Sequence, residues 1–241
     1  TRGISRNIGE STGVHATVYA INTAGAFLGT LTAGFYLIPE YGLPMTVMGT
    51  ALLNLTAFLF FYFMPAIGGS DYMPEDIPQE DHSAEAPKFS PVFLYLIAFL
   101  SGFYVMTLEN VFIRLTNLSL GSSSYSFSMI VSVFILAIAI GSYTVGRLKT
   151  LAPNLLYVNQ ICITLLLLLI YFSLDTWTYW AHLIRISFQS NIAGFWSYYA
   201  FVFMVLSFVL IIPVGFMGAT VPIAFHELRR DLKNVGKHSG L

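Results

Sequence analysis

Glu109 is the most prominent ionisable side chain within the long apolar stretches of this sequence. Arg114 follows it by five positions. Five residues turn a helix by about 140°, so the two side chains would pair poorly within one helix. A charge inside a membrane-spanning segment is costly and is often functional. We expect the two residues to tie neighbouring helices together at the membrane interface, and handling of a substrate or a proton by Glu109 is the alternative.

Amide side chains in the middle of other apolar segments form a second set of polar candidates. Asn22 is the first of them along the chain, and with Glu109 and Arg114 it makes up a candidate intramembrane polar site. Amides at this depth more often hydrogen-bond a neighbouring helix than a ligand. We therefore expect interhelical hydrogen bonds from four residues, namely Asn22, Asn54, Asn159 and Gln160.

Pro213 completes the candidate polar site and interrupts the last apolar segment. A proline inside a helix removes one backbone hydrogen bond, and Gly215, Gly218 and Pro222 loosen the same segment further. We expect an ordinary proline kink here. A broken helix that lines a cavity, as in transporters, is the alternative.

Other chemistry has no support in the sequence. No nucleophile stands beside a base in a known motif, no glycine-rich nucleotide loop follows a strand, and no Cys/His cluster has metal-ligand spacing. The net charge of −1 does not indicate a nucleic-acid partner. These residues are therefore predicted to hold no catalytic group, no metal and no cofactor.

The composition indicates the elements that position these residues. Apolar residues make up 56% of the chain and charged residues 10%, against about 45–50% and about 25% in soluble domains. Uncharged runs such as 115–146, 150–174 and 186–225 exceed the roughly 20 residues that cross a bilayer core. We predict an all-α polytopic transmembrane bundle of about six spans, at 14–38, 43–66, 91–113, 124–146, 153–174 and 197–224.

The connections between these segments indicate domains and topology. An acidic, proline-containing linker at 67–90 separates a two-helix segment, 1–66, from a four-helix segment, 91–241. With a cytoplasmic N-terminus, nine Lys and Arg residues fall on the cytoplasmic side and two, Arg114 and Arg185, on the other. We expect a plasma (inner) membrane protein with both termini and the linker in the cytoplasm. Residues 175–195, rich in Trp and Tyr, are expected to form an interfacial helix or loop, with a re-entrant segment as the alternative.

Small residues recur at helical spacing in two of the segments. Gly25 and Gly29 lie in the first, and Gly141 and Gly146 in the fourth. Faces without large side chains allow another helix to approach closely. We expect these glycines to pack inside the bundle of this chain, and a dimer interface is the alternative.

A weak internal similarity relates the two ends of the chain. The spacing of Arg6, Gly13, His15 and Ala16 is repeated by Arg229, Gly236, His238 and Ser239. Many membrane proteins consist of two related halves. The similarity favours a chain that covers one repeat and enters the next.

Several segments together resemble the membrane half of the membrane-bound spermidine-synthase-like proteins, in which a major-facilitator-like helical region is fused to an aminopropyltransferase-type domain. The resembling positions are 19–29, 33–35, Glu109, Arg114, 120–125, 134–142, 146–147, Pro213 and 218–222. The resemblance implies a longer parent chain with more helices, built from inverted or parallel repeats. The sequence departs from the family's tendency to carry a tryptophan before the residue that corresponds to Arg114.

The family resemblance also bears on activity. Its true synthases carry a Rossmann-like domain that binds decarboxylated S-adenosylmethionine and a polyamine, and these 241 residues contain no such domain. We expect a non-catalytic membrane domain that is a subunit of a complex, as scaffold or anchor for a protein partner or for missing parts of the same chain. A transporter-like domain for a small, polyamine-like solute and the anchor of an aminopropyltransferase are the alternatives.

Overall fold

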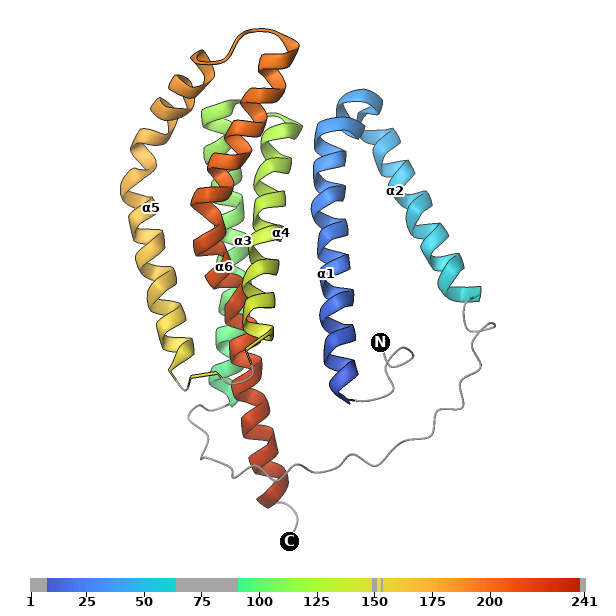
Figure 1. The fold of residues 1–241 in the computed structure, drawn as a ribbon, viewed down its shortest axis with the longest axis vertical. Coiled ribbons are helices and arrows are strands. Elements are labelled where there is room, and N and C mark those ends of the chain that lie inside the picture. Colours follow the sequence, from blue (N-terminus) through green and yellow to red (C-terminus); the bar gives the residue numbers. More distant parts are fainter. Residues whose placement is uncertain (1–7, 64–90, 149–150, 153, 239–241) are drawn as a thin grey trace.

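The computed structural model describes residues 8–63, 91–148, 151–152 and 154–238, and every regular element among them is a helix. Figure 1 shows helices that run up and down between two ends of the molecule. The elements in chain order are α1 (Ile8–Thr32), the π-helix η1 (Ala33–Leu37), α2 (Ile38–Phe63), α3 (Pro91–Leu120), α4 (Ser124–Gly146), α5 (Leu155–Ile186) and α6 (Ile192–His238). The predicted all-α class is confirmed.

Helices α4 and α6 form the centre of the bundle. Helix α4 packs against α6, α1 and α3, and α6 packs against α4, α5 and α3. The largest fully buried apolar side chains come from these two helices, with Phe134 and Met129 on α4 and Leu210 and Met217 on α6. Apolar side chains on the remaining helices are often exposed, as expected for a surface that faces lipid.

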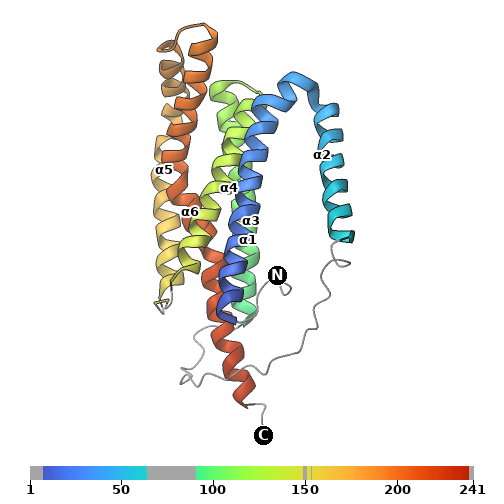
Figure 2. The same ribbon diagram turned by 45° about the vertical axis from the view of Figure 1, so that its right-hand side comes forward.

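The first two helices form a hairpin whose bend lies at η1 and Gly42. Helix η1 is wider than an α-helix, because its hydrogen bonds join residues five positions apart. The N–H of Ile38 donates to the carbonyl of Ala33. Gly42 then adopts a φ of 75°, which other residues rarely accept, and the helix resumes toward Pro44. Figures 1 and 2 show the two arms running in opposite directions, with α2 standing away from the other helices.

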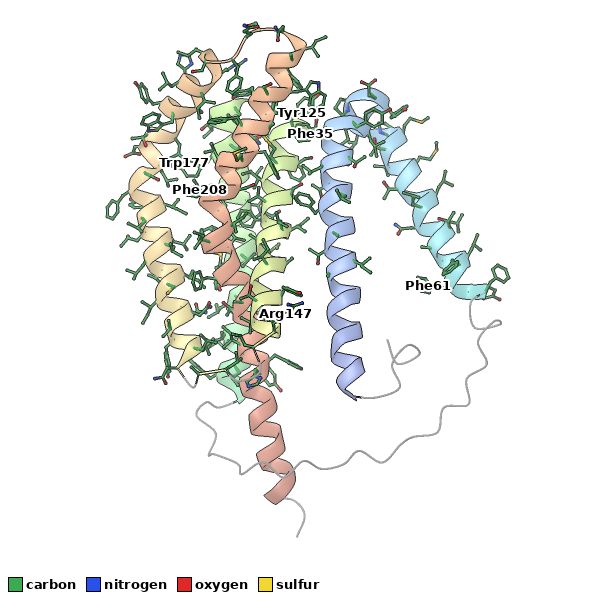
Figure 3. All side chains as sticks on the ribbon, viewed as in Figure 1. Phe35, Phe61, Tyr125, Arg147, Trp177 and Phe208 are labelled. Carbon is green, nitrogen blue, oxygen red and sulfur yellow. The ribbon has the colours of Figure 1, made fainter. Side chains whose placement is uncertain are left out.

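The bend of this hairpin is joined to the rest of the bundle by small and aromatic residues. The backbone of Gly34 lies against Ser128 of α4, and the Ser124 hydroxyl donates to the Gly34 carbonyl at 3.0 Å. The rings of Phe35 and Tyr125 have centroids 5.1 Å apart, and Figure 3 shows both at the same end of the molecule. The ring of Phe35 also meets that of Tyr199 on α6, at 5.8 Å. The hairpin is thus fixed at its bend, while none of the residues of α2 is buried.

A tight turn connects α3 to α4. Gly121 has a φ of 96°, and the Ser123 hydroxyl accepts a hydrogen bond from the N–H of Ser126 at 3.2 Å. This is the usual side-chain cap of a helix N-terminus. The Ser126 hydroxyl in turn donates to the Gly121 carbonyl at 2.9 Å. The turn therefore sets where α4 begins.

Several predicted boundaries are wrong: α1 begins at Ile8 and not at 14, and α3, α5 and α6 extend beyond their predicted ends at 113, 174 and 224. Helix α3 continues from the predicted end at 113 to Leu120, because no glycine or proline intervenes before Gly121. Helix α5 continues to Ile186, so most of the expected interfacial segment at 175–195 forms its last three turns. Its Trp and Tyr residues suit the headgroup region, but none of them interrupts a helix. Helix α6 begins at Ile192 and is continuous through Pro213 and Pro222.

Five helices are long and apolar enough to cross a membrane among the residues that the structure describes. The first of them, Ala20–Phe63, has 44 residues and contains the bend, so the predicted six segments count its two arms separately. Helix α5, with 32 residues, is about 48 Å long and exceeds a hydrocarbon core of about 30 Å. Its C-terminal end, which carries the aromatic residues, is therefore longer than a span of the hydrocarbon core requires.

The ends of several helices lie together, while the predicted cytoplasmic location of the termini and of the linker stays a prediction. Figure 1 shows α1 beginning, α2 ending, α3 beginning and α6 ending at the same end of the molecule. The predicted linker at 67–90, and Arg6 and Ser239 of the predicted repeat, lie outside the described residues. The major-facilitator-like repeat and the division into 1–66 and 91–241 stay predictions.

Candidate functional site: a polar junction and a cavity

The predicted polar site residues lie on three helices. Glu109 is half-buried and Arg114 exposed on α3, Asn22 is exposed on α1, and Pro213 is buried in α6. Neither Glu109 nor Arg114 has an ion-pair partner among the described residues. None of the four lines the cavity described below. The structure therefore does not bring them into one pocket.

The four predicted packing glycines have different surroundings. A Cβ on Gly141 would collide with the carbonyl oxygen of Gly215, so α4 and α6 are in backbone contact there. Nothing lies within 4 Å of the Cβ position of Gly25, Gly29 or Gly146. The glycines of the first and fourth predicted segments have similar spacing in the sequence, but only Gly141 contacts another helix among these four.

The α4 and α6 crossing extends over a further turn. A Cβ on Gly218 would lie 2.6 Å from the Cα of Ile138, and the Ser142 hydroxyl donates to the Gly218 carbonyl at 2.8 Å. Small residues on α6 thus allow the approach, and a serine on α4 hydrogen-bonds across it. This pattern of close backbones and a polar cross-link is typical of helix pairs in membranes.

A polar junction is buried where α3, α5 and α6 meet. The hydroxyl of Thr220 on α6 accepts from Asn159 Nδ2 at 2.9 Å and from Gln160 Nε2 at 3.3 Å. It also lies 3.2 Å from the Tyr104 hydroxyl of α3 and 3.3 Å from the Phe216 carbonyl. Because a hydroxyl has one hydrogen and two lone pairs, that hydrogen serves either Tyr104 or Phe216 at any moment.

The structure shows the interhelical hydrogen bonds expected of Asn159 and Gln160. It leaves Asn22 and Asn54 exposed. Sequence reasoning did not identify Thr220, which is fully buried, or Tyr104. The signal was the pair of adjacent amides itself, since such groups require a partner inside an apolar bundle. Which hydroxyl supplies the partner depends on how the helices are aligned.

A cavity of about 280 Å³ lies between the C-terminal parts of α3 and α5 and residues 202–206 of α6. Its polar lining consists of Thr116, Ser119, Ser173 and Thr176, two indoles come from Trp177 and Trp180, and the other lining residues are aliphatic. None of the lining side chains is ionisable. Trp180 is 55% exposed, so the cavity reaches the surface beside it. Sequence reasoning did not predict this cavity, because a gap between helices has no motif.

Three polar side chains of the cavity wall, Ser173, Thr176 and Trp177, are already hydrogen-bonded. The Trp177 indole N–H donates to the Ser173 hydroxyl at 3.0 Å, and that hydroxyl donates to the Ile170 carbonyl at 2.7 Å. Figure 3 shows Trp177 between α5 and α6, and its ring lies 5.7 Å from that of Phe112. Thr116, in contrast, is 4% exposed, and its buried Oγ1 has no hydrogen-bond partner among the described residues.

The lining of the cavity is suited to binding a molecule. No group of three or more His, Cys, Asp or Glu side chains able to hold a metal occurs in the described part of the chain. The cavity presents hydroxyls and indoles, which can orient a neutral molecule. Comparisons with protein families, curated proteins and solved structures found no match for this chain.

Proposed function

We propose that this chain is a non-catalytic, multi-pass membrane domain that anchors or scaffolds a partner. The observation that carries the proposal is the contrast between α2 and the central helices. Helix α2 contributes no buried residue and packs on η1, whereas α4 and α6 supply the largest fully buried apolar side chains. A helix that is apolar all round and has so few neighbours in its own chain has its surface available for lipid or for another protein.

The far end of α2 strengthens this argument. It carries Phe58, Phe60, Phe61, Tyr62 and Phe63, each at least 60% exposed. Figure 3 shows Phe61 at the end of α2 that is distant from the bundle. Aromatic side chains supply large contact areas in protein interfaces. The partner would be a membrane protein or a further part of the same polypeptide, such as the aminopropyltransferase-type domain of the family that the sequence resembles.

Purification of the full-length protein in mild detergent, followed by native mass spectrometry, tests this proposal. We expect a stoichiometric complex that is lost when Met45, Leu52 and Phe60 of α2 are replaced together by alanine. The matched control replaces Leu165, Leu169 and Phe172, which are exposed on α5, and keeps the complex. A wild-type protein that carries only lipid and detergent would refute the scaffold. The complete reading frame shows whether the partner is part of the same chain.

Transport of a small solute is the second candidate, and the half-buried Glu109 without an ion pair among the described residues favours it. Uptake of labelled polyamines into vesicles with reconstituted protein is the test. Glu109→Gln should abolish uptake, and Glu40→Gln, at an exposed position of α2, should leave it unchanged. Wild-type vesicles that behave like empty liposomes would exclude polyamine transport.

A further inference from the structure

We propose that the cavity between α3, α5 and α6 is a binding site for a neutral, mostly apolar molecule with one hydroxyl group, of the class of membrane-soluble phenols and alcohols. The size of the cavity sets the first limit. A cavity of about 150 Å³ holds benzene, so 280 Å³ suits a body of two fused rings.

The charge of the ligand follows from the wall. An ion that entered the cavity would lose its hydration and find no opposite charge, because no ionisable side chain lines the cavity. The apolar body would lie against the indole of Trp177 and aliphatic residues such as Val205 and Leu206. A neutral aromatic molecule is therefore the favoured occupant.

Thr116 supplies the reason for the hydroxyl group. Thr116 lines the cavity, and its buried Oγ1 has no partner among the described residues, although a buried hydroxyl normally has one. The neighbouring polar groups Ser173 and Trp177 satisfy each other. A ligand hydroxyl would complete the hydrogen bonding of Thr116.

The position of the cavity gives such a ligand a route of entry. Thr116 lies in the last two turns of α3, and Trp177 and Trp180 lie beyond the first 20 residues of α5. In helices that cross a bilayer from their first residues, these positions would lie near the headgroups, where amphipathic molecules collect with the polar group toward water. The exposed Trp180 borders the opening.

The test compares 1-naphthol with naphthalene, which has the same rings without the hydroxyl. Full-length protein in lipid nanodiscs is dialysed against each labelled compound, and binding to empty nanodiscs is subtracted. We expect one saturable site per chain with an affinity about fivefold higher for 1-naphthol, as for one net hydrogen bond. To show whether a membrane lipid occupies the cavity, the molecules bound to the purified protein are extracted and identified by mass spectrometry.

Three variants assign the site. Thr116→Val should remove the preference for 1-naphthol and retain naphthalene binding, whereas Val205→Trp should abolish both by filling the cavity. Thr107→Val, on the exposed face of α3 where the hydroxyl bonds the Phe103 carbonyl, should change neither. Absence of saturable binding, equal affinities in the wild type, or an unchanged preference in Thr116→Val would each overturn the proposal. Thr116→Val is decisive even if Val205→Trp does not fold.

Discussion

The carbonyl oxygen of Gly215 occupies the space in which a side chain on residue 141 would begin, so α4 and α6 touch through their backbones. Gly141→Ala should therefore force the two helices apart and lower the free energy of unfolding by about 1–3 kcal/mol. SDS titration of the protein in mixed micelles measures this change. Gly146→Ala, where nothing lies within 4 Å, is the control and should change stability by less than about 0.5 kcal/mol. Equal effects of the two substitutions would contradict the contact.

The polar junction gives a second prediction. Thr220→Val keeps the shape of the side chain but leaves the amides of Asn159 and Gln160 without their acceptor. We expect a loss of about 1–2 kcal/mol in the same titration. Thr164→Val removes a hydroxyl that bonds the backbone carbonyl of Gln160 at an exposed position of α5 and should have little effect. A Thr220→Val protein as stable as the wild type would show that the junction is not a stabilising contact.

The turn between α3 and α4 gives a third prediction. Ser123→Ala removes the acceptor for the N–H of Ser126 and should cost about 1 kcal/mol, as other helix caps do. Ser122, which is exposed in the same turn, is the matched control. Circular dichroism during thermal unfolding in detergent compares the two variants. A larger loss in Ser122→Ala would mean that the cap is placed wrongly.

The path of the chain across the membrane is tested by cysteine labelling in a Cys162→Ala background. A membrane-impermeant maleimide applied to whole cells should modify Ser122→Cys and Asn191→Cys, at the connections of one end, but not Leu148→Cys at the other. Tyr41→Cys, at the bend of the hairpin, should be labelled as Ser122→Cys and Asn191→Cys are, if α1 and α2 each cross the membrane. Labelling of Leu148→Cys and Ser122→Cys from the same side would exclude spanning by α4.

The sequence predicted where the helices lie along the chain better than it predicted which helices contact one another. Hydropathy located the apolar segments, because lipid requires a long uncharged run for each span, and the interruption at residues 39–42 fell at the bend of the hairpin. The ends at Leu120 and Ile186 were missed because polar and aromatic residues were taken as the end of a helix, although a glycine or a serine-containing turn actually ends it. Gly141 and Gly146 could not be distinguished, because only the position of α6 makes one of them a contact. Thr116 and Thr220 had no signal of their own for the same reason.

The junction at Thr220 also restricts how this protein can move. Helices α3, α5 and α6 are connected through one oxygen atom, at distances of 2.9–3.3 Å. Sliding any of these helices by one turn, about 5.4 Å, would break its hydrogen bond at that oxygen inside an apolar interior. These three helices should therefore move as one rigid body. Because η1 is held against α4 and α6, the place left for a hinge in the first hairpin is Gly42, and α2, which has no buried residue, is the arm that it would move.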